Sequence, residues 1–188
     1  MTQLKLSVVI PAFNAARFVA AAIDSVLDQH YPGTYEIIVV NDGSTDGTGE
    51  IVEAYGGPVR HIRQSNQGPA TARNTGVIAA RHPLVLLLDA DDIALPGRLE
   101  RQAAFMEARP DIDICFGNWI VEGENDDYLA RYGIAAPAHT FVEVVDPLPR
   151  LLARGSFVPT STVAIRRTAY LESGMQPKGA FYAEDYAL

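Results

Sequence analysis

Two carboxylates separated by one residue follow the most apolar segment of the chain. Asp89 and Asp91 come directly after Leu84–Leu88, whose residues are all apolar, as in a central strand of a sheet. Side chains at i and i+2 of an extended segment project to the same side, so we expect these two carboxylates to lie together. Hard oxygen donors suit Mg²⁺ or Mn²⁺, which would neutralise charge on a diphosphate leaving group. The alternative for residues 89–92 is a solvated acidic turn.

A second polar cluster, Asn41–Ser44, follows the predicted strand Tyr35–Val40. The carboxylate of Asp42 can accept a hydrogen bond from an imide N–H such as N3 of uracil. The alternative is a tight turn in which an Asx side chain caps its own backbone, with Ser44 or Thr45 capping the next helix. The turn role and the ligand role are compatible.

Three further segments have residue types that suit a nucleotide. After the apolar run Leu6–Ile10, the ring of Phe13 can lie against a flat base, although Asn14 could equally be a helix cap. Arg73 lies near the start of a helix and can pair with a phosphate or a base carbonyl, or can simply be solvated. Close to the C-terminus, Glu184 and Asp185 offer a general base for a hydroxyl nucleophile, or are an exposed chain end.

Alternation of apolar runs and helical periodicity predicts the elements that position these residues. Strands are expected at 6–10, 35–40, 59–63, 84–88 and 112–121, and helices at 15–29, after 44–45, at 68–80 and from Pro96. This order predicts an open, mostly parallel α/β sheet, in which ligands bind at the carboxyl ends of the strands. The pattern weakens after residue 122, where we expect a loop or flap at 122–139, helices at 147–154 and 168–173, and a strand at 162–165.

Composition excludes several classes of function. The chain has 188 residues, 48% of them hydrophobic, and 15 basic against 23 acidic residues give a net charge of −8, which argues against a nucleic-acid partner. Its one cysteine, Cys115, can form neither an internal disulfide nor a zinc cluster. The sequence lacks the Gly-x-Gly-x-x-Gly motif of dinucleotide oxidoreductases and the Gly-Lys-Ser/Thr motif of Walker-type NTPases. No apolar run approaches the roughly 20 residues of a transmembrane span and no signal peptide is evident, so we expect a cytoplasmic protein.

Taken together, these segments resemble the family 2 glycosyltransferases of the GT-A fold. The matching pieces, in chain order, are Ser7–Asn14, Ser25–Leu27 with Gln29, Ile38–Asp46, Asn66–Gly68, Ala72–Gly76, Asp89–Asp92 and Glu184–Asp185. Each motif alone is weak, and the specificity lies in their common order along the chain. The resemblance implies an inverting enzyme of polysaccharide biosynthesis that uses a nucleotide-sugar, usually a UDP-sugar, together with Mg²⁺ or Mn²⁺.

The resemblance also implies a role for each matching position. Asp42 would hold the base, Arg73 would contact the nucleotide, Asp91 would coordinate the metal, and Asp185 would be the catalytic base, with Glu184 in a supporting role. Asp89 would support the ribose or the metal shell, and the remaining residues expected to line the nucleotide-sugar pocket are Pro11, Ala12, Phe13 and Ala90.

The sequence departs from the family pattern in two places. Asn41 stands where the family often has Asp, and only Tyr186, Ala187 and Leu188 follow the Glu-Asp pair, so we expect a chain truncated just after that motif. We therefore expect a single GT-A domain over 1–188, with a nucleotide-binding half at about 1–121 and an incomplete acceptor-side part at about 122–188. The alternative is a nucleotide-sugar-binding fragment without turnover. The acceptor could be a saccharide, a lipid carrier or a protein, and a lipid-linked acceptor would place the protein at the membrane periphery.

Overall fold

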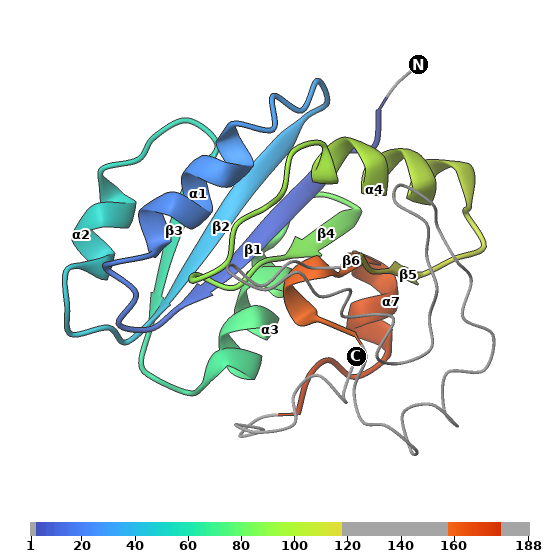
Figure 1. Cartoon of the computed structure of the whole chain (residues 1–188). Coiled ribbons are helices and arrows are strands. Elements are labelled where there is room, and N and C mark those ends of the chain that lie inside the picture. The colour runs from blue at the N-terminus through green and yellow to red at the C-terminus, as the bar shows by residue number, and fades with distance from the viewer. Residues whose placement is uncertain (1–2, 118–157, 178–188) are drawn as a thin grey trace.

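In the described part of the chain, six strands form one mixed sheet. The computed structural model describes residues 3–117 and 158–177 (Figure 1). The strands are β1 (Leu6–Ala12), β2 (Tyr35–Asp42), β3 (Val59–Gln64), β4 (Leu84–Leu87), β5 (Ile114–Cys115) and β6 (Ala164–Arg166). Their spatial order is β3-β2-β1-β4-β6-β5, in which β3, β2, β1 and β4 are parallel neighbours and β6 runs antiparallel to β4 and β5. The prediction of an open, mostly parallel α/β sheet is confirmed.

Helices cover both faces of this sheet (Figure 1). One face packs against α1 (Val19–Leu27), α2 (Thr48–Glu53) and α4 (Arg98–Ala108), and the other against α3 (Pro69–Ala79) and α7 (Arg167–Glu172). Successive residues of the central strands point to opposite faces of the sheet and so belong to two hydrophobic cores. Val8 packs in the core with α1, α2 and α4, and Val9 packs in the core with α3 and α7. Within the residues that the structure describes, no helix has the length and apolar composition that crossing a membrane requires.

The bounds of several elements differ from those predicted. Strand β1 continues through Pro11 to Ala12 because β2 runs alongside it, with Ala12 paired to Asn41. Helix α1 is shorter than the predicted 15–29, and the described part of the predicted strand 112–121 is reduced to Ile114–Cys115. The loop expected at 122–139 and the helix expected at 147–154 lie outside the described residues.

Gly76 brings α3 close to the sheet. A methyl group at this position would overlap Cγ1 of Val9 and lie 3.3 Å from Cγ2 of Val40. We expect Gly76→Ala to lower the free energy of unfolding by about 1–3 kcal/mol, because overpacking outweighs the gain in helix propensity. Urea unfolding measures the change. Gly56→Ala is the control, since nothing lies within 4 Å of its added carbon, and an equal loss in both variants would contradict the packing explanation.

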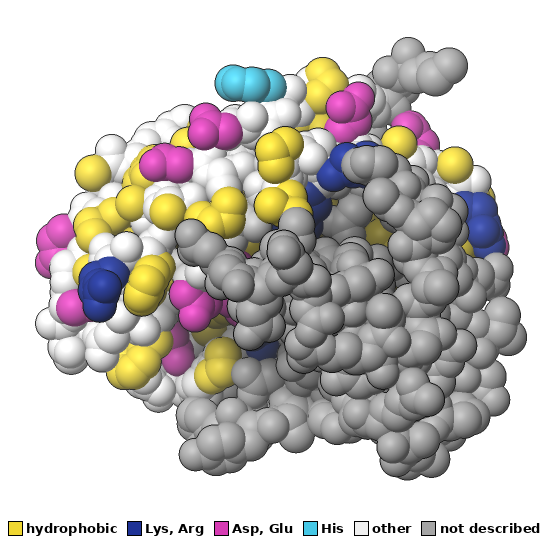
Figure 2. Space-filling view, in the orientation of Figure 1, with side chains coloured by type: hydrophobic (Ala, Val, Ile, Leu, Met, Phe, Trp, Pro, Cys, Tyr) yellow, Lys and Arg dark blue, Asp and Glu magenta, His cyan; other side chains and the backbone are white. Residues whose placement is uncertain are grey.

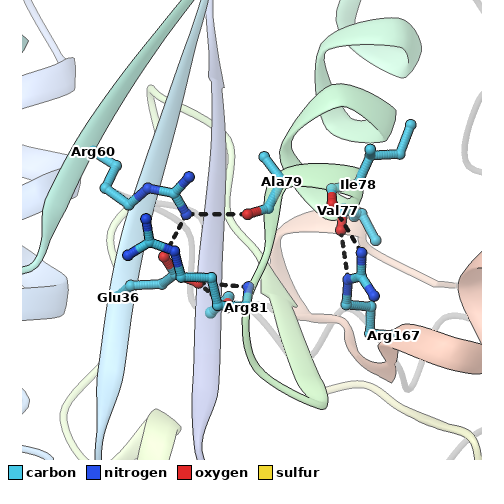
Figure 3. Close-up of polar contacts among 8 residues, drawn as sticks. Glu36, Arg60, Val77, Ile78, Ala79, Arg81 and Arg167 are labelled. Atoms are coloured by element: carbon cyan, nitrogen blue, oxygen red, sulfur yellow. Dashed lines mark hydrogen bonds and ion pairs between the residues drawn. The ribbon is translucent and has the colours of Figure 1, made fainter.

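A buried carboxylate ties the strands together near the start of β2 (Figure 3). Oε1 of Glu36 accepts hydrogen bonds from the Ser7 hydroxyl at 2.8 Å and from the Arg81 backbone N–H at 2.7 Å, and Oε2 accepts one from Arg60 at 2.6 Å. Arg60 also donates to the carbonyl of Ala79 at the end of α3. Burial raises the pKa of Glu36, but these hydrogen bonds outweigh burial and hold the pKa below its ordinary value.

This depressed pKa predicts a loss of stability in acid. The contribution of Glu36 is fully present above the ordinary glutamate value of about 4.3 and is lost as the pH falls through the lower value of the folded state. We expect the free energy of unfolding of the wild type to fall more steeply below that pH than that of Glu36→Gln, measured by urea titration at a series of pH values. Glu172→Gln, at an exposed position, is the control, and equal slopes in wild type and Glu36→Gln would contradict the prediction.

Candidate functional site

Candidate site residues from three segments lie at the carboxyl ends of neighbouring strands. Phe13 follows β1, Asp42 ends β2, and residues 89–92, called the acidic turn below, follow β4. These strands are neighbours, with β1 in the centre, so the segments that come after them lie along one edge of the sheet. The loops after β1 and β2 are tied together, because the backbone N–H of Asn14 donates to Oγ of Ser44 at 3.0 Å and that of Thr45 donates to Oδ1 of Asn14 at 2.9 Å. Phe13 is half-exposed in this loop, which leaves its ring free for stacking.

These bonds correct two predictions about caps. Asn14 has a positive φ of 49° and contacts the loop after β2 instead of capping α1. Ser44 and Thr45 are engaged with Asn14, so neither caps α2. The carboxylate of Asp46, which precedes the N-cap residue Gly47, instead accepts the backbone N–H of Thr48 through Oδ1 and that of Ala16 through Oδ2, each at 3.0 Å. These hydrogen bonds hold the pKa of Asp46 below its ordinary value, the largest contribution coming from the Thr48 hydroxyl.

Asp42 is almost fully buried and organises the turn that begins α3. Its Oδ1 accepts hydrogen bonds from Nε2 of Gln64 at 2.6 Å and from the backbone N–H of Gln67 at 3.0 Å. Its Oδ2 accepts the backbone N–H of Gly68 at 2.8 Å, and Gly68 has a φ of 88° that favours glycine. Since each carboxylate oxygen can accept two hydrogen bonds, Oδ2 keeps capacity for a ligand donor among the contacts that the structure describes. Turn and ligand roles therefore remain compatible, as predicted.

Arg73 joins α3 to the acidic turn. Its guanidinium is buried and its Nη2 lies 2.7 Å from Oδ1 of Asp89, whose side chain is 29% exposed. The alternative of a solvated helix arginine is wrong. Helix α3 and its N-cap residue thus connect two candidate site carboxylates, since the amide of Gly68 contacts Asp42 and Arg73, in the second turn, contacts Asp89.

Residues 89–92 form a turn, so the expectation of an extended segment is wrong. The β4 ladder ends at Leu87, and the backbone N–H of Asp92 donates to the carbonyl of Asp89 at 3.1 Å. Asp91 and Asp92 are exposed, whereas Ala90 is buried beneath them. Desolvation and the neighbouring charges of Asp89 and Asp91 raise the pKa of Asp92, against the effect of a hydrogen bond with Ser161.

The donor set at this turn fits a hard divalent cation. Asp91 offers free carboxylate oxygens, while Asp89 is already paired with Arg73. In the described part of the chain no three acidic, histidine or cysteine side chains converge on one point. A cation here would complete its shell with diphosphate oxygens and water, which is the usual mode for Mg²⁺. Acidic side chains are spread over the face seen in Figure 2, so an anionic ligand needs such a counter-charge.

Sequence reasoning missed several residues that shape the site, notably Gln64, Arg98 and Ser161. Their types carry no periodic signal, and their contacts join segments far apart in the chain. Glu184 and Asp185, the predicted base and its neighbour, lie outside the described residues.

Comparisons with known proteins identify the family. The model for glycosyl transferase family 2 matches residues 7–172. An uncharacterized glycosyltransferase of Nostoc sp. is 33% identical over 171 residues, which are 87% of this chain and 51% of the relative. The glycosyltransferase GlyG of Streptococcus pneumoniae is 34% identical over 136 residues, or 70% of this chain and 44% of GlyG. The chain thus spans about half the length of these relatives.

Solved structures share the fold. The S. aureus TarS structure with UDP-GlcNAc has a TM-score of 0.75 and 27% identity, covering 97% of this chain and 51% of the TarS chain. The mannosyltransferase PcManGT from Pyrobaculum calidifontis, solved with GDP-Man and Mn²⁺, has a TM-score of 0.71 and 20% identity, covering 98% of this chain and 51% of that one. The second likeness concerns the fold alone, and both agree with a GT-A architecture.

Proposed function

Because the chain belongs to glycosyltransferase family 2, we propose that it transfers a sugar from a nucleotide-sugar, specifically a UDP-sugar, to an acceptor hydroxyl. The observation that carries the proposal is the link made by α3, which joins Asp42 at the end of β2 to Asp89 after β4 through Gly68 and Arg73. In this proposal one ligand touches both carboxylates, with its base at the first and its diphosphate at the second. TarS, which binds UDP-GlcNAc, supports uracil as the base.

In this proposal, residues at the ends of β1 and β2 bind the base. Oδ2 of Asp42 accepts the imide N–H of uracil, for which it has capacity beyond the Gly68 amide. The half-exposed ring of Phe13 lies against the base, and Pro11 and Ala12 form the floor of the pocket at the end of β1. Cytosine has no imide N–H, so UDP should bind better than CDP.

The acidic turn is the proposed diphosphate end of the site. Asp91, with support from Asp89, would hold Mg²⁺ or Mn²⁺, and that ion supplies neutralisation of the charge on the departing diphosphate. Arg73 keeps the Asp89 carboxylate at this edge through their ion pair.

The proposed chemistry is inverting, with Asp185 as the base. Its carboxylate removes the proton of the acceptor hydroxyl, whose oxygen attacks the anomeric carbon on the side opposite the departing UDP. The bond to the UDP oxygen breaks as the new glycosidic bond forms, so the configuration at the anomeric carbon inverts. The support for this step is the match of Glu184–Asp185 to the family motif.

A thermal-shift screen with UDP, GDP, dTDP and CDP, each with and without Mn²⁺, tests the binding half of the proposal. We expect UDP with Mn²⁺ to raise the melting temperature most. A ligand at 100 times its Kd that binds only the folded state adds about 2.7 kcal/mol to the free energy of unfolding. A panel of UDP-sugars then tests transfer, with Asp185→Asn expected to bind UDP normally but transfer no sugar. If no nucleotide stabilises the protein, the proposal fails. Binding without transfer would favour the non-catalytic alternative.

A further inference from the structure

The short helix η1 (Thr160–Thr162) contacts the acidic turn, although the two segments are some 70 residues apart in the chain. The backbone N–H of Asp89 donates to Oγ of Ser161 at 2.9 Å. The Ser161 hydroxyl also acts to lower the pKa of Asp92, the last residue of the turn, against the effect of burial. Ser161 therefore holds the first residue of the turn through the backbone N–H of Asp89 and favours the charged carboxylate of the last.

The position of Ser161 is itself fixed by two side chains of α4. Nη2 of Arg98 donates to the carbonyls of Leu87 at 2.8 Å and Val163 at 3.3 Å, which joins the end of β4 to the residue after η1. Nε of Arg98 donates to Oε1 of Gln102, and Nε2 of Gln102 donates to the carbonyl of Thr162 at 2.7 Å. Within η1, the Thr162 backbone N–H donates to the Pro159 carbonyl at 2.9 Å. The hydrogen bonds of Arg98 and Gln102 therefore fix η1, and with it the Ser161 hydroxyl, next to the acidic turn.

We propose that Ser161 is a positioning residue for the cation site, fixing the turn that carries Asp91 in the conformation that binds the ion. The inference rests on the proposed function, because it assigns to the turn a divalent cation that bridges to a diphosphate. Among the described residues, Ser161 contacts the acidic turn and not Asp42, whose partners come from residues 64–68. Its loss therefore weakens cation binding and leaves base recognition intact.

A titration with Mn²⁺ at a fixed concentration of UDP tests this role in the full chain. Binding is measured by thermal shift and by the electron paramagnetic resonance spectrum of Mn²⁺. We expect Ser161→Ala to raise the Mn²⁺ concentration at half-saturation by about three- to tenfold, the range for one lost hydrogen bond. Ser161→Thr keeps the hydroxyl and should restore the wild-type value within about twofold. Affinity for UDP without Mn²⁺ should not change.

Ser173→Ala is the matched control, because it also deletes a serine hydroxyl, one that donates to the carbonyl of Tyr170 at 2.9 Å in α7. An unchanged Mn²⁺ requirement in Ser161→Ala overturns the inference and leaves the proposed function standing. Equal weakening of UDP binding with and without Mn²⁺ also overturns it, since that is the mark of general damage. If the wild type binds UDP without any effect of Mn²⁺, the proposed metal role fails and the inference fails with it.

Discussion

Asp91→Asn is expected to abolish the effect of Mn²⁺ on UDP binding and to lower sugar transfer by about a hundredfold or more, since metal stabilisation of a leaving group is worth several kcal/mol. The side chain of Asp91 is exposed at the acidic turn, and no described residue donates a hydrogen bond to its carboxylate. Removing its charge should therefore cost the fold little. The measurements are thermal shift with UDP and Mn²⁺, and initial rates with the preferred UDP-sugar.

Asp111→Asn controls for the loss of one negative charge. Asp111 is exposed and paired with Arg109 at 2.9 Å, in the connection between α4 and β5. We expect this variant to bind UDP and respond to Mn²⁺ as the wild type does. Retention of a full Mn²⁺ response in Asp91→Asn would remove Asp91 from the cation site.

Arg73→Met is expected to lower the free energy of unfolding by about 2–4 kcal/mol, because it leaves the partly buried Asp89 carboxylate without its cationic partner. The same change should weaken UDP binding in the presence of Mn²⁺, since Arg73 holds Asp89 at the site edge. Urea unfolding gives the first quantity and a thermal-shift titration the second. Adding Asp89→Asn to Arg73→Met should recover part of the lost stability, because the uncompensated charge is then gone.

Arg63→Met is a sharp control for this prediction. Arg63 and Glu53 lie 2.6 Å apart, about as close as Arg73 and Asp89, but both side chains are more than half exposed. Screening by water should limit the loss of stability to under about 1 kcal/mol. If Arg73→Met and Arg63→Met lose similar amounts of unfolding free energy, burial of the Arg73–Asp89 pair does not increase its contribution to stability.

Local sequence patterns were sufficient to predict an open, mostly parallel sheet and the edge at which the candidate site residues of three of its strands lie. The apolar runs before Pro11, Asn41 and Asp89 each became a strand, and because these strands are parallel neighbours, the loops after them lie at one edge. The pattern failed at residues 89–92, where side-chain spacing implied an extended segment. Strand β4 ends at Leu87, and the backbone N–H of Asp92 then donates a hydrogen bond to the carbonyl of Asp89, which closes a turn.

Contacts between distant segments could not be read from the sequence. Ser44 and Thr45 do not cap α2 because they are already bonded to Asn14, some 30 residues earlier in the chain, and the first residue of α2 bonds to Asp46. Ser161 meets Asp89 across 72 residues, and nothing about a lone serine distinguishes it from its neighbours. Such pairings depend on the three-dimensional register of strands and helices, which no single window of residues encodes.

In the proposed site, α3 would set the spacing between the end that binds the base and the end that binds the diphosphate, because Gly68 contacts Asp42 and Arg73 contacts Asp89. Pro69 and Arg73, the first residue of α3 and the residue that contacts Asp89, are about 6 Å apart along the helix axis, and the missing side chain of Gly76 lets α3 pack closely against Val9 and Val40. A nucleotide whose base binds at Asp42 would contact the acidic turn only if its phosphate chain is long enough to span the distance between them. Discrimination between nucleoside mono- and diphosphates would then come from backbone spacing, without any side chain dedicated to counting phosphates.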